Sequence, residues 1–284
     1  MIKRILVALD LDTDTPIAIR YAISLAEKFN ASVSGLAIVD TAHIDQTVGV
    51  GPLGTLYYAQ KLQEHLTEEA RTKAGEVLQS FNDLISRSGV EHVELMEEGV
   101  PFERIREDLK FHDLLIIGRD THFFYNRPGK DTKTLAKLVK NTSGPVLVVT
   151  PEYLHVDHIA VAHDGSIAAS RALQWLVQLN PFGNEIVVDL INVCDKDDKD
   201  KEDRSRLLLH LAADYLRHHG FKRISQIILP KGNTGEAILE QVSGSGADMI
   251  VLGAHSYSAI KRMTFGSVTH HLICESDVPL FLSS

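Results

Sequence analysis

The chain has 284 residues, of which 44% are hydrophobic and 24% charged, a composition typical of a globular protein with one large or two small domains. The formal net charge of -9 argues against bulk binding to nucleic acid or to an anionic membrane surface. No apolar run approaches the roughly 20 residues that span a bilayer. Cys194 and Cys274 form no disulfide framework, so we expect a cytoplasmic protein.

Apolar strand-like runs alternate with helix-like segments along the chain, and the whole series occurs twice. The strands predicted in the first half are Met1–Leu9, Ser32–Val39, His92–Glu97, Leu114–Ile117 and Val146–Val149. Those in the second half are Val156–His163, Ile186–Val193, Ile224–Leu229, Met249–Leu252 and Leu280–Leu282. The helices predicted between them include Pro16–Phe29, Ala59–Ser88, Thr132–Asn141, Ser166–Leu179, Lys201–His219 and Gly266–Glu275.

Strands that alternate with helices predict a parallel sheet covered by helices on both faces. We therefore predict the α/β class, with two tandem doubly wound five-stranded parallel-sheet domains at residues 1–150 and 151–284. A short linker is expected near Thr150–Asp157, where the apolar pattern is lost. In such sheets, ligands bind beyond the carboxyl ends of the strands.

Two polar stretches interrupt the repeat. Asp40–Gln60 accounts for most of the extra length of the first half, and we interpret it as a surface loop in preference to a lid or a partner-docking loop. At the matching place in the second half, the charged run Asp195–Arg204 predicts a solvated, mobile loop.

The stretch around the fourth strand of the second half carries a pattern that suits phosphate binding. Gly253 ends the strand, and Gly266-Ser267 opens the following helix. Glycines let backbone N–H groups approach phosphate oxygens, and a helix N-terminus adds partial positive charge. The stretch resembles the signature of the universal stress protein family, which is Gly, two residues, Gly, nine residues, and Gly-Ser or Gly-Thr. The spacing is intact here, with Ser256 in place of the second glycine.

The resemblance covers nearly the whole chain as two tandem domains and implies an adenine nucleotide alpha hydrolase-like fold. It also implies that the second half binds ATP, or AMP or ADP, with or without Mg²⁺. By the resemblance, Asp164 contacts the nucleoside, the Val193 backbone holds adenine, and the glycine-containing loop cradles the phosphates, where His255 could add positive charge. The predicted binding residues are Asp164, Gly165, Ser166, Val193, Gly253, His255, Ser256, Gly266, Ser267 and Val268.

The corresponding stretch of the first half departs from the signature. Gly118 is retained, but Thr121 stands at the second glycine and Thr132-Lys133 stands where the second half has Gly266-Ser267. Asp10 is followed by Leu11-Asp12 and not by Gly-Ser, which adds negative charge near any phosphate. We interpret this half as a vestigial or non-nucleotide site.

The function that we expect is that of a tandem stress-response protein, with the nucleotide acting as the signal for a sensor or regulator with an unknown protein partner. The alternative is an interaction or scaffold protein of the same fold that binds no nucleotide, or binds another small ligand. No catalytic residue and no metal site is predicted, since no HExxH or CxxC spacing occurs, and any ATP hydrolysis should be slow.

Universal stress proteins commonly dimerise by antiparallel pairing of their fifth strands. Val146–Val149 and Leu280–Leu282 are both apolar, and an exposed apolar edge strand invites aggregation unless it is paired. We therefore predict that these two strands pair within the chain, giving a pseudo-dimeric monomer. Association of whole chains into a homodimer is the other arrangement considered.

Overall fold

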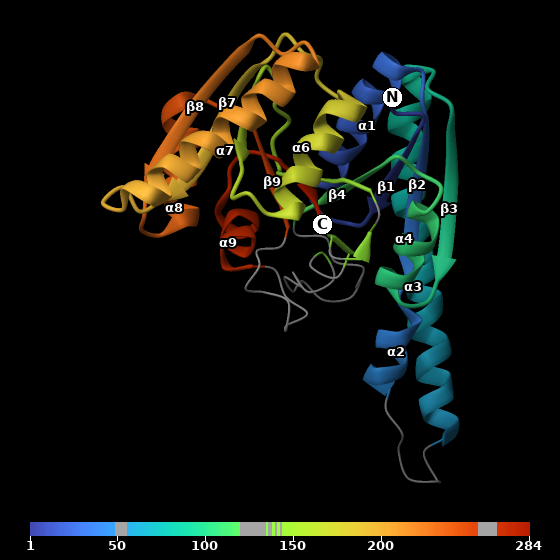
Figure 1. Ribbon diagram of the computed structural model, residues 1–284. Coiled ribbons are helices and arrows are strands. Elements are labelled where there is room, and N and C mark those ends of the chain that lie inside the picture. The colour runs from blue at the N-terminus through green and yellow to red at the C-terminus, as the bar shows by residue number, and fades with distance from the viewer. Residues whose placement is uncertain (49–55, 120–134, 136–137, 140, 143, 255–265) are drawn as a thin grey trace. The chain divides into compact units, whose positions relative to one another are not determined.

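The computed structural model describes residues 1–48, 56–119, 135, 138–139, 141–142, 144–254 and 266–284 (Figure 1). The chain forms two compact units, which we call the first unit, Ile2–Leu138, and the second unit, Val139–Ser284 together with Met1. Within the described ranges, no helix is long and apolar enough to cross a lipid bilayer.

The first unit is built on a parallel sheet with the strand order β3-β2-β1-β4. Its elements are β1 (Arg4–Leu9), α1 (Thr15–Phe29), β2 (Ser32–Val39), α2 (Thr41–Val48), α3 (Leu56–Ile85), η2 (Ser86–Ser88), β3 (His92–Glu98), α4 (Pro101–Leu109) and β4 (Leu114–Gly118). The inner strands β1 and β4 are almost completely buried, as expected for continuous apolar runs in a parallel sheet covered on both faces.

The second unit repeats this architecture and adds two strands at one edge, in the order β5-β10-β9-β6-β7-β8. Its elements are β5 (Val146–Val149), β6 (His158–Ala162), α6 (Ile167–Leu179), β7 (Val187–Cys194), α7 (Lys199–His218), β8 (Arg223–Pro230), α8 (Thr234–Ser245), β9 (Met249–Gly253), α9 (Ser267–Glu275) and β10 (Leu280–Ser283). The predicted fifth-strand pairing is confirmed, because β5 runs antiparallel to β10 and Leu147 lies opposite Phe281. All other strand pairs described in this unit are parallel.

Equivalent polar contacts recur in the two units and show that the repeat extends below the level of secondary structure. Just before β4, Asp113 Oδ2 accepts the backbone N–H groups of Lys3 and Arg4 at 2.7 and 3.0 Å. Just before β9, Asp248 Oδ2 accepts those of Asp157 and His158 at 3.0 and 2.9 Å. Each carboxylate therefore fixes the start of the neighbouring central strand.

The first helices of the two units also end in the same way. Asn30 after α1 and Asn180 after α6 adopt left-handed backbone conformations, with φ of 50° and 46°. Asparagine tolerates this conformation better than most residues and is used at helix C-termini for that reason.

The stretch Asp40–Gln60 is not the surface loop that the sequence analysis predicts. Residues 41–48 form α2, and α3 begins at Leu56; residues 49–55 lie outside the described part. Asp40 initiates α2 by accepting the His43 N–H through Oδ1 at 2.9 Å, a typical N-cap contact. Figure 1 shows α2 and the first half of α3 extending beyond the strands of the first unit.

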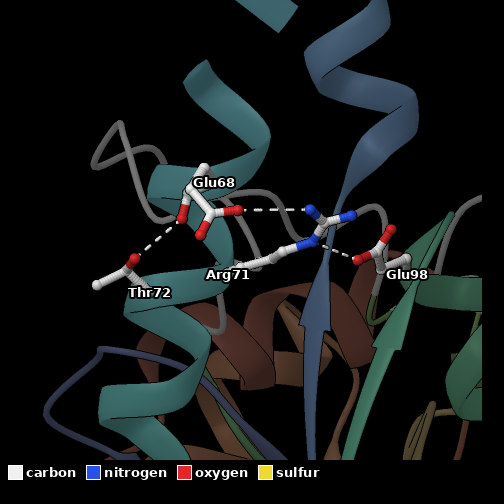
Figure 2. Close-up of polar contacts among 4 residues, drawn as sticks. All are labelled: Glu68, Arg71, Thr72 and Glu98. Carbon is white, nitrogen blue, oxygen red and sulfur yellow. Dashed lines mark hydrogen bonds and ion pairs between the residues drawn. The ribbon is translucent and has the colours of Figure 1, made fainter. Parts of the chain in front are cut away.

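The long helix α3 is anchored on the first unit by its second half. Ala70, Ala74, Leu78, Phe81 and Ile85 are buried, whereas no residue among 57–69 is. Where the buried half begins, Arg71 joins α3 to the end of β3 by an ion pair, as Figure 2 shows (Nε to Glu98 Oε1, 2.6 Å). A second, longer contact joins Arg71 to Glu68 at 3.4 Å.

The charged run Asp195–Arg204 is also more ordered than predicted. Helix α7 begins at Lys199, and Asp198 caps it by accepting the Lys201 N–H at 3.3 Å. Acidic residues in the first turn interact favourably with the helix dipole, and Asp200 and Glu202 lie there. The acids that suggested a solvated loop thus serve as a helix start.

Candidate functional site

A pocket of about 270 Å³ lies at the carboxyl ends of β6, β7 and β9 in the second unit. Parallel α/β sheets bind ligands in this position. The starts of α8 and α9 complete the wall, through Thr234 and Gly266. Apolar side chains form much of the lining, including Ile191, Ile238 and Leu252.

The turn after β6 presents the Asp164 carboxylate at this pocket. Asp164 is exposed, and its Oδ1 accepts the Ser166 N–H at 2.9 Å. Gly165 between them has a φ of +81°, a conformation that residues with a side chain rarely adopt. Ser166 then caps α6, its Oγ accepting the Ala169 N–H at 3.1 Å. The Asp-Gly-Ser sequence therefore builds a tight turn that leaves one carboxylate oxygen facing outward.

Gly253 allows close packing between the end of β9 and α6. A Cβ atom at this position would lie 2.3 Å from the backbone N of Ala169 and 2.5 Å from the carbonyl carbon of Ala168. No side chain fits there without movement of the helix backbone. Gly253 therefore has a structural role in packing β9 against α6. It also lines the pocket, where the resemblance assigns it to phosphate binding.

The N-terminus of α9 borders the pocket. Gly266 precedes the helix with φ of -58° and ψ of 152°, and both Gly266 and Val268 line the pocket. The first N–H groups of a helix have no acceptor within the helix, so they suit an anionic ligand group. Thr269 Oγ1 donates to the carbonyl oxygen of Gly253 at 3.5 Å, which joins α9 to the strand end.

His163 and Asn192 form a buried polar network at the pocket wall. Asn192 Nδ2 donates to the His163 carbonyl oxygen at 2.7 Å, and Asn192 Oδ1 accepts from Ser205 Oγ of α7 at 2.7 Å. The ring Nδ1 of His163 lies 3.1 Å from the Gly165 N–H and accepts from it. Burial lowers the pKa of His163, which favours the neutral ring.

The structure brings together some of the predicted residues. Asp164, Val193, Gly253, Gly266 and Val268 line the pocket, whereas Gly165, Ser166 and Ser267 are not part of its lining. His255 and Ser256 lie outside the described residues.

The sequence analysis missed other lining residues. They are Ala162, His163, Ala169, Ile191, Asn192, Thr234, Ile238, Leu252 and Thr269. Most of them look like ordinary core residues in the sequence. A polar residue near the carboxyl end of a predicted strand, such as Asn192, could have indicated a pocket-lining position.

The matching acid of the first unit is turned inward. Asp10 is 3% exposed, and its Oδ1 accepts from Thr15 Oγ1 at 2.7 Å and from the Asp12 N–H at 3.0 Å. Asp14 is buried too, and its Oδ2 accepts the Arg119 N–H at 3.1 Å. Thr121, Thr132 and Lys133 lie outside the described residues.

Neither a metal centre nor a disulfide is found in the described ranges. No three histidine, cysteine or acidic side chains there are grouped so as to hold a metal ion. Both cysteines are free thiols, and Cys274 Sγ lies 3.9 Å from His270 Nδ1 on the same helix.

Comparison with known proteins identifies the fold family. The sequence model of the Universal stress protein family matches residues 1–150 and again residues 155–283. The chain belongs to the universal stress protein family. It is 22% identical over 271 residues to Universal stress protein Slr1230 of Synechocystis, an alignment that spans 92% of each protein.

Solved universal stress proteins share the fold. A universal stress protein from Archaeoglobus fulgidus is similar over 99% of this chain and 96% of its own, with a TM-score of 0.67 and 20% identity. A universal stress protein whose structure was solved in complex with cAMP is similar over 45% of this chain and 97% of its own, with a TM-score of 0.36 and 18% identity. The predicted α/β class and tandem organisation are confirmed by the family match and by the Archaeoglobus structure.

Proposed function

We propose that the second unit binds one adenine nucleotide, ATP or the related ADP or AMP, in the pocket at the ends of β6, β7 and β9. The observation that carries the proposal is that an exposed carboxylate, Asp164, and a helix N-terminus, at Gly266, border the same partly apolar pocket. A carboxylate suits ribose hydroxyls, the N-terminus of α9 suits phosphate, and apolar walls suit a base.

The dimensions and chemistry of the pocket support this assignment. Its volume of about 270 Å³ suits a nucleoside. Val193 and Ile191 from β7 would pack on the base, while the backbone at Gly266 and Val268 would meet the phosphates. A Mg²⁺ ion would enter with the phosphates, whose oxygens are ligands that Mg²⁺ commonly uses.

We propose further that the first domain, residues 1–150, holds no nucleotide and that nucleotide binding in the second domain, residues 151–284, regulates contact with a protein partner. The inward-turned Asp10 supports the first part. This makes the chain a stress-response regulator in which nucleotide hydrolysis, if it occurs, is slow. The cytoplasmic location expected from the cysteines stays a prediction.

Calorimetric titration of the full chain with ATP, ADP and AMP tests the proposal, with one site per chain as the expected result. Gly266→Val places a branched side chain where the phosphates meet the backbone, so ATP affinity should fall about tenfold or more, corresponding to about 1.4 kcal/mol.

Gly244→Val is the matched control. Gly244 lies in α8, and nothing stands within 4 Å of an added Cβ, so nucleotide affinity should be unchanged. Two equivalent sites per chain, or equal affinities of the two variants, would contradict the proposal. Failure of all three nucleotides to bind would favour the alternative, an interaction protein of the same fold.

A further inference from the structure

A second cavity, of about 210 Å³, lies between α6 and α7 in the second unit. We call it the α6–α7 pocket, and Figure 1 shows the two helices side by side. Leu173 of α6 and Leu208, Leu211 and Tyr215 of α7 form its apolar walls. All of its lining residues belong to the described part of the second unit.

The pocket exists because short side chains face long ones between the two helices. Ser170 and Ala212 also line it, and neither fills the space between the leucines. Leu211 remains 59% exposed as a result. Tyr215 is held by its ring contact with His219, at a centroid distance of 4.7 Å. An apolar cavity with a fixed aromatic wall is suited to a small ring.

His163 gives this pocket a polar group. The residue is only 5% exposed, and it lines both the α6–α7 pocket and the nucleotide pocket. Its Nδ1 accepts the Gly165 N–H, so in the neutral ring the proton is on Nε2. Among the described residues, Nε2–H has no hydrogen-bond acceptor. An acceptor atom on a ligand in the pocket would give this N–H a hydrogen-bond partner.

We propose that the α6–α7 pocket binds a small aromatic molecule that carries a neutral carbonyl oxygen. The oxygen accepts from His163 Nε2–H, and the ring packs against Leu173, Leu208 and Leu211. A carboxylate ligand is disfavoured, because the adjacent residue is Asp164 and the chain carries a net charge of -9. The volume admits a single ring with a short substituent. This site shares His163 with the nucleotide pocket, but the proposal does not depend on nucleotide binding.

Titration of the full chain with benzamide, followed by calorimetry, tests the site. Leu211→Gln replaces part of the apolar wall and should weaken benzamide binding about fivefold, since half of a leucine burial is worth about 1 kcal/mol. Leu207→Gln is the matched control, because Leu207 is equally exposed on α7, at 59%, but does not line the pocket. Glutamine is a good helix former, so neither variant should unfold α7.

A second comparison tests the hydrogen bond. The unmodified chain should bind benzamide more tightly than toluene, and His163→Phe should abolish that preference whatever it does to either affinity alone. Equal benzamide affinities in Leu211→Gln and Leu207→Gln would overturn the proposal, as would failure of the unmodified chain to bind benzamide. A preference that survives in His163→Phe would also overturn it. None of these outcomes bears on ATP binding, which is measured separately.

Discussion

The two units use the same acid after the first strand in opposite ways. In the first unit, Asp10 is buried, and its Oδ1 accepts from Thr15 at the start of α1 and from the Asp12 N–H. In the second unit, Asp164 is exposed and accepts one local N–H, from Ser166. A buried carboxylate that already accepts from its own segment has little capacity for a ligand. The same position of the repeat therefore carries an inward-facing acid in one unit and an outward-facing acid in the other.

Other parts of the repeat have not diverged. Asp113 and Asp248 make the same pair of contacts to the start of a central strand, and Asn30 and Asn180 end equivalent helices. These residues hold the sheet and its helices in place, so both units need them. These shared residues serve the fold in both units, whereas the exposed Asp164 is the residue that the proposed ligand would need.

The largest expected effect concerns Gly253, which lets the end of β9 pack closely against α6 in the second unit. Gly253→Ala would force the α6 backbone away from β9 and should destabilise the second unit by about 3 kcal/mol. Denaturant unfolding followed by the fluorescence of Trp175, the single tryptophan of the chain, reports on this unit. Gly232→Ala, where nothing lies within 4 Å of an added Cβ, should leave the midpoint unchanged. Loss of ATP binding without loss of stability in Gly253→Ala would show that the glycine serves the ligand alone.

An intermediate effect should separate the two acids. Asp10→Ala should destabilise the first unit by about 2 kcal/mol, because it leaves the Thr15 hydroxyl and the Asp12 N–H without their acceptor. Asp164→Ala should leave stability nearly unchanged and weaken ATP binding about tenfold, corresponding to about 1.4 kcal/mol. Circular dichroism unfolding and calorimetric titration measure the two properties. The comparison fails if Asp10→Ala changes nucleotide binding or if Asp164→Ala changes only stability.

The smallest effect is a dependence of stability on pH that the two units share. Burial lowers the pKa of His112 in the first unit and of His163 in the second. Each unfolded histidine takes up a proton below about pH 6.5, while the folded one resists protonation, so the free energy of unfolding should fall as the pH drops below that value.

In His163→Phe, the stability of the second unit, followed by Trp175 fluorescence, should depend less on pH. The pH dependence of the stability of the first unit should remain. A pH dependence of the second unit that is identical in His163→Phe and the unmodified chain would show that other groups cause it.

Much of the fold could be predicted, because buried parallel strands such as Met249–Leu252 are continuous apolar runs, here bounded by Asp248 and Gly253. The two mistaken loops have a common cause. Helix α2 buries one residue, Ile44, and therefore has little apolar periodicity. The start of α7 is hard to predict because its first turn is rich in charged residues. Capping residues such as Asp40 and Asp198 were the signals that would have placed both helices.

The candidate site was predictable only in part. The turn at Asp164 and the glycines at 253 and 266 follow a recognisable spacing, and they do border the pocket. His163 could not be singled out, because its value comes from a ring that is buried between two cavities formed by distant segments. The position of the His163 ring relative to α7 depends on the tertiary fold, so no local sequence pattern predicts it.

The antiparallel pair β5–β10 has a consequence for synthesis on the ribosome. Val146 pairs with Leu282, so the edge of β5 that faces β10 has no partner while the intervening residues are being made. At about 5–20 residues per second this interval lasts several seconds or longer. During that time an apolar strand edge is open to pairing with other nascent chains. Slow translation through the second half would lengthen this exposure, and aggregation during expression should depend on elongation rate.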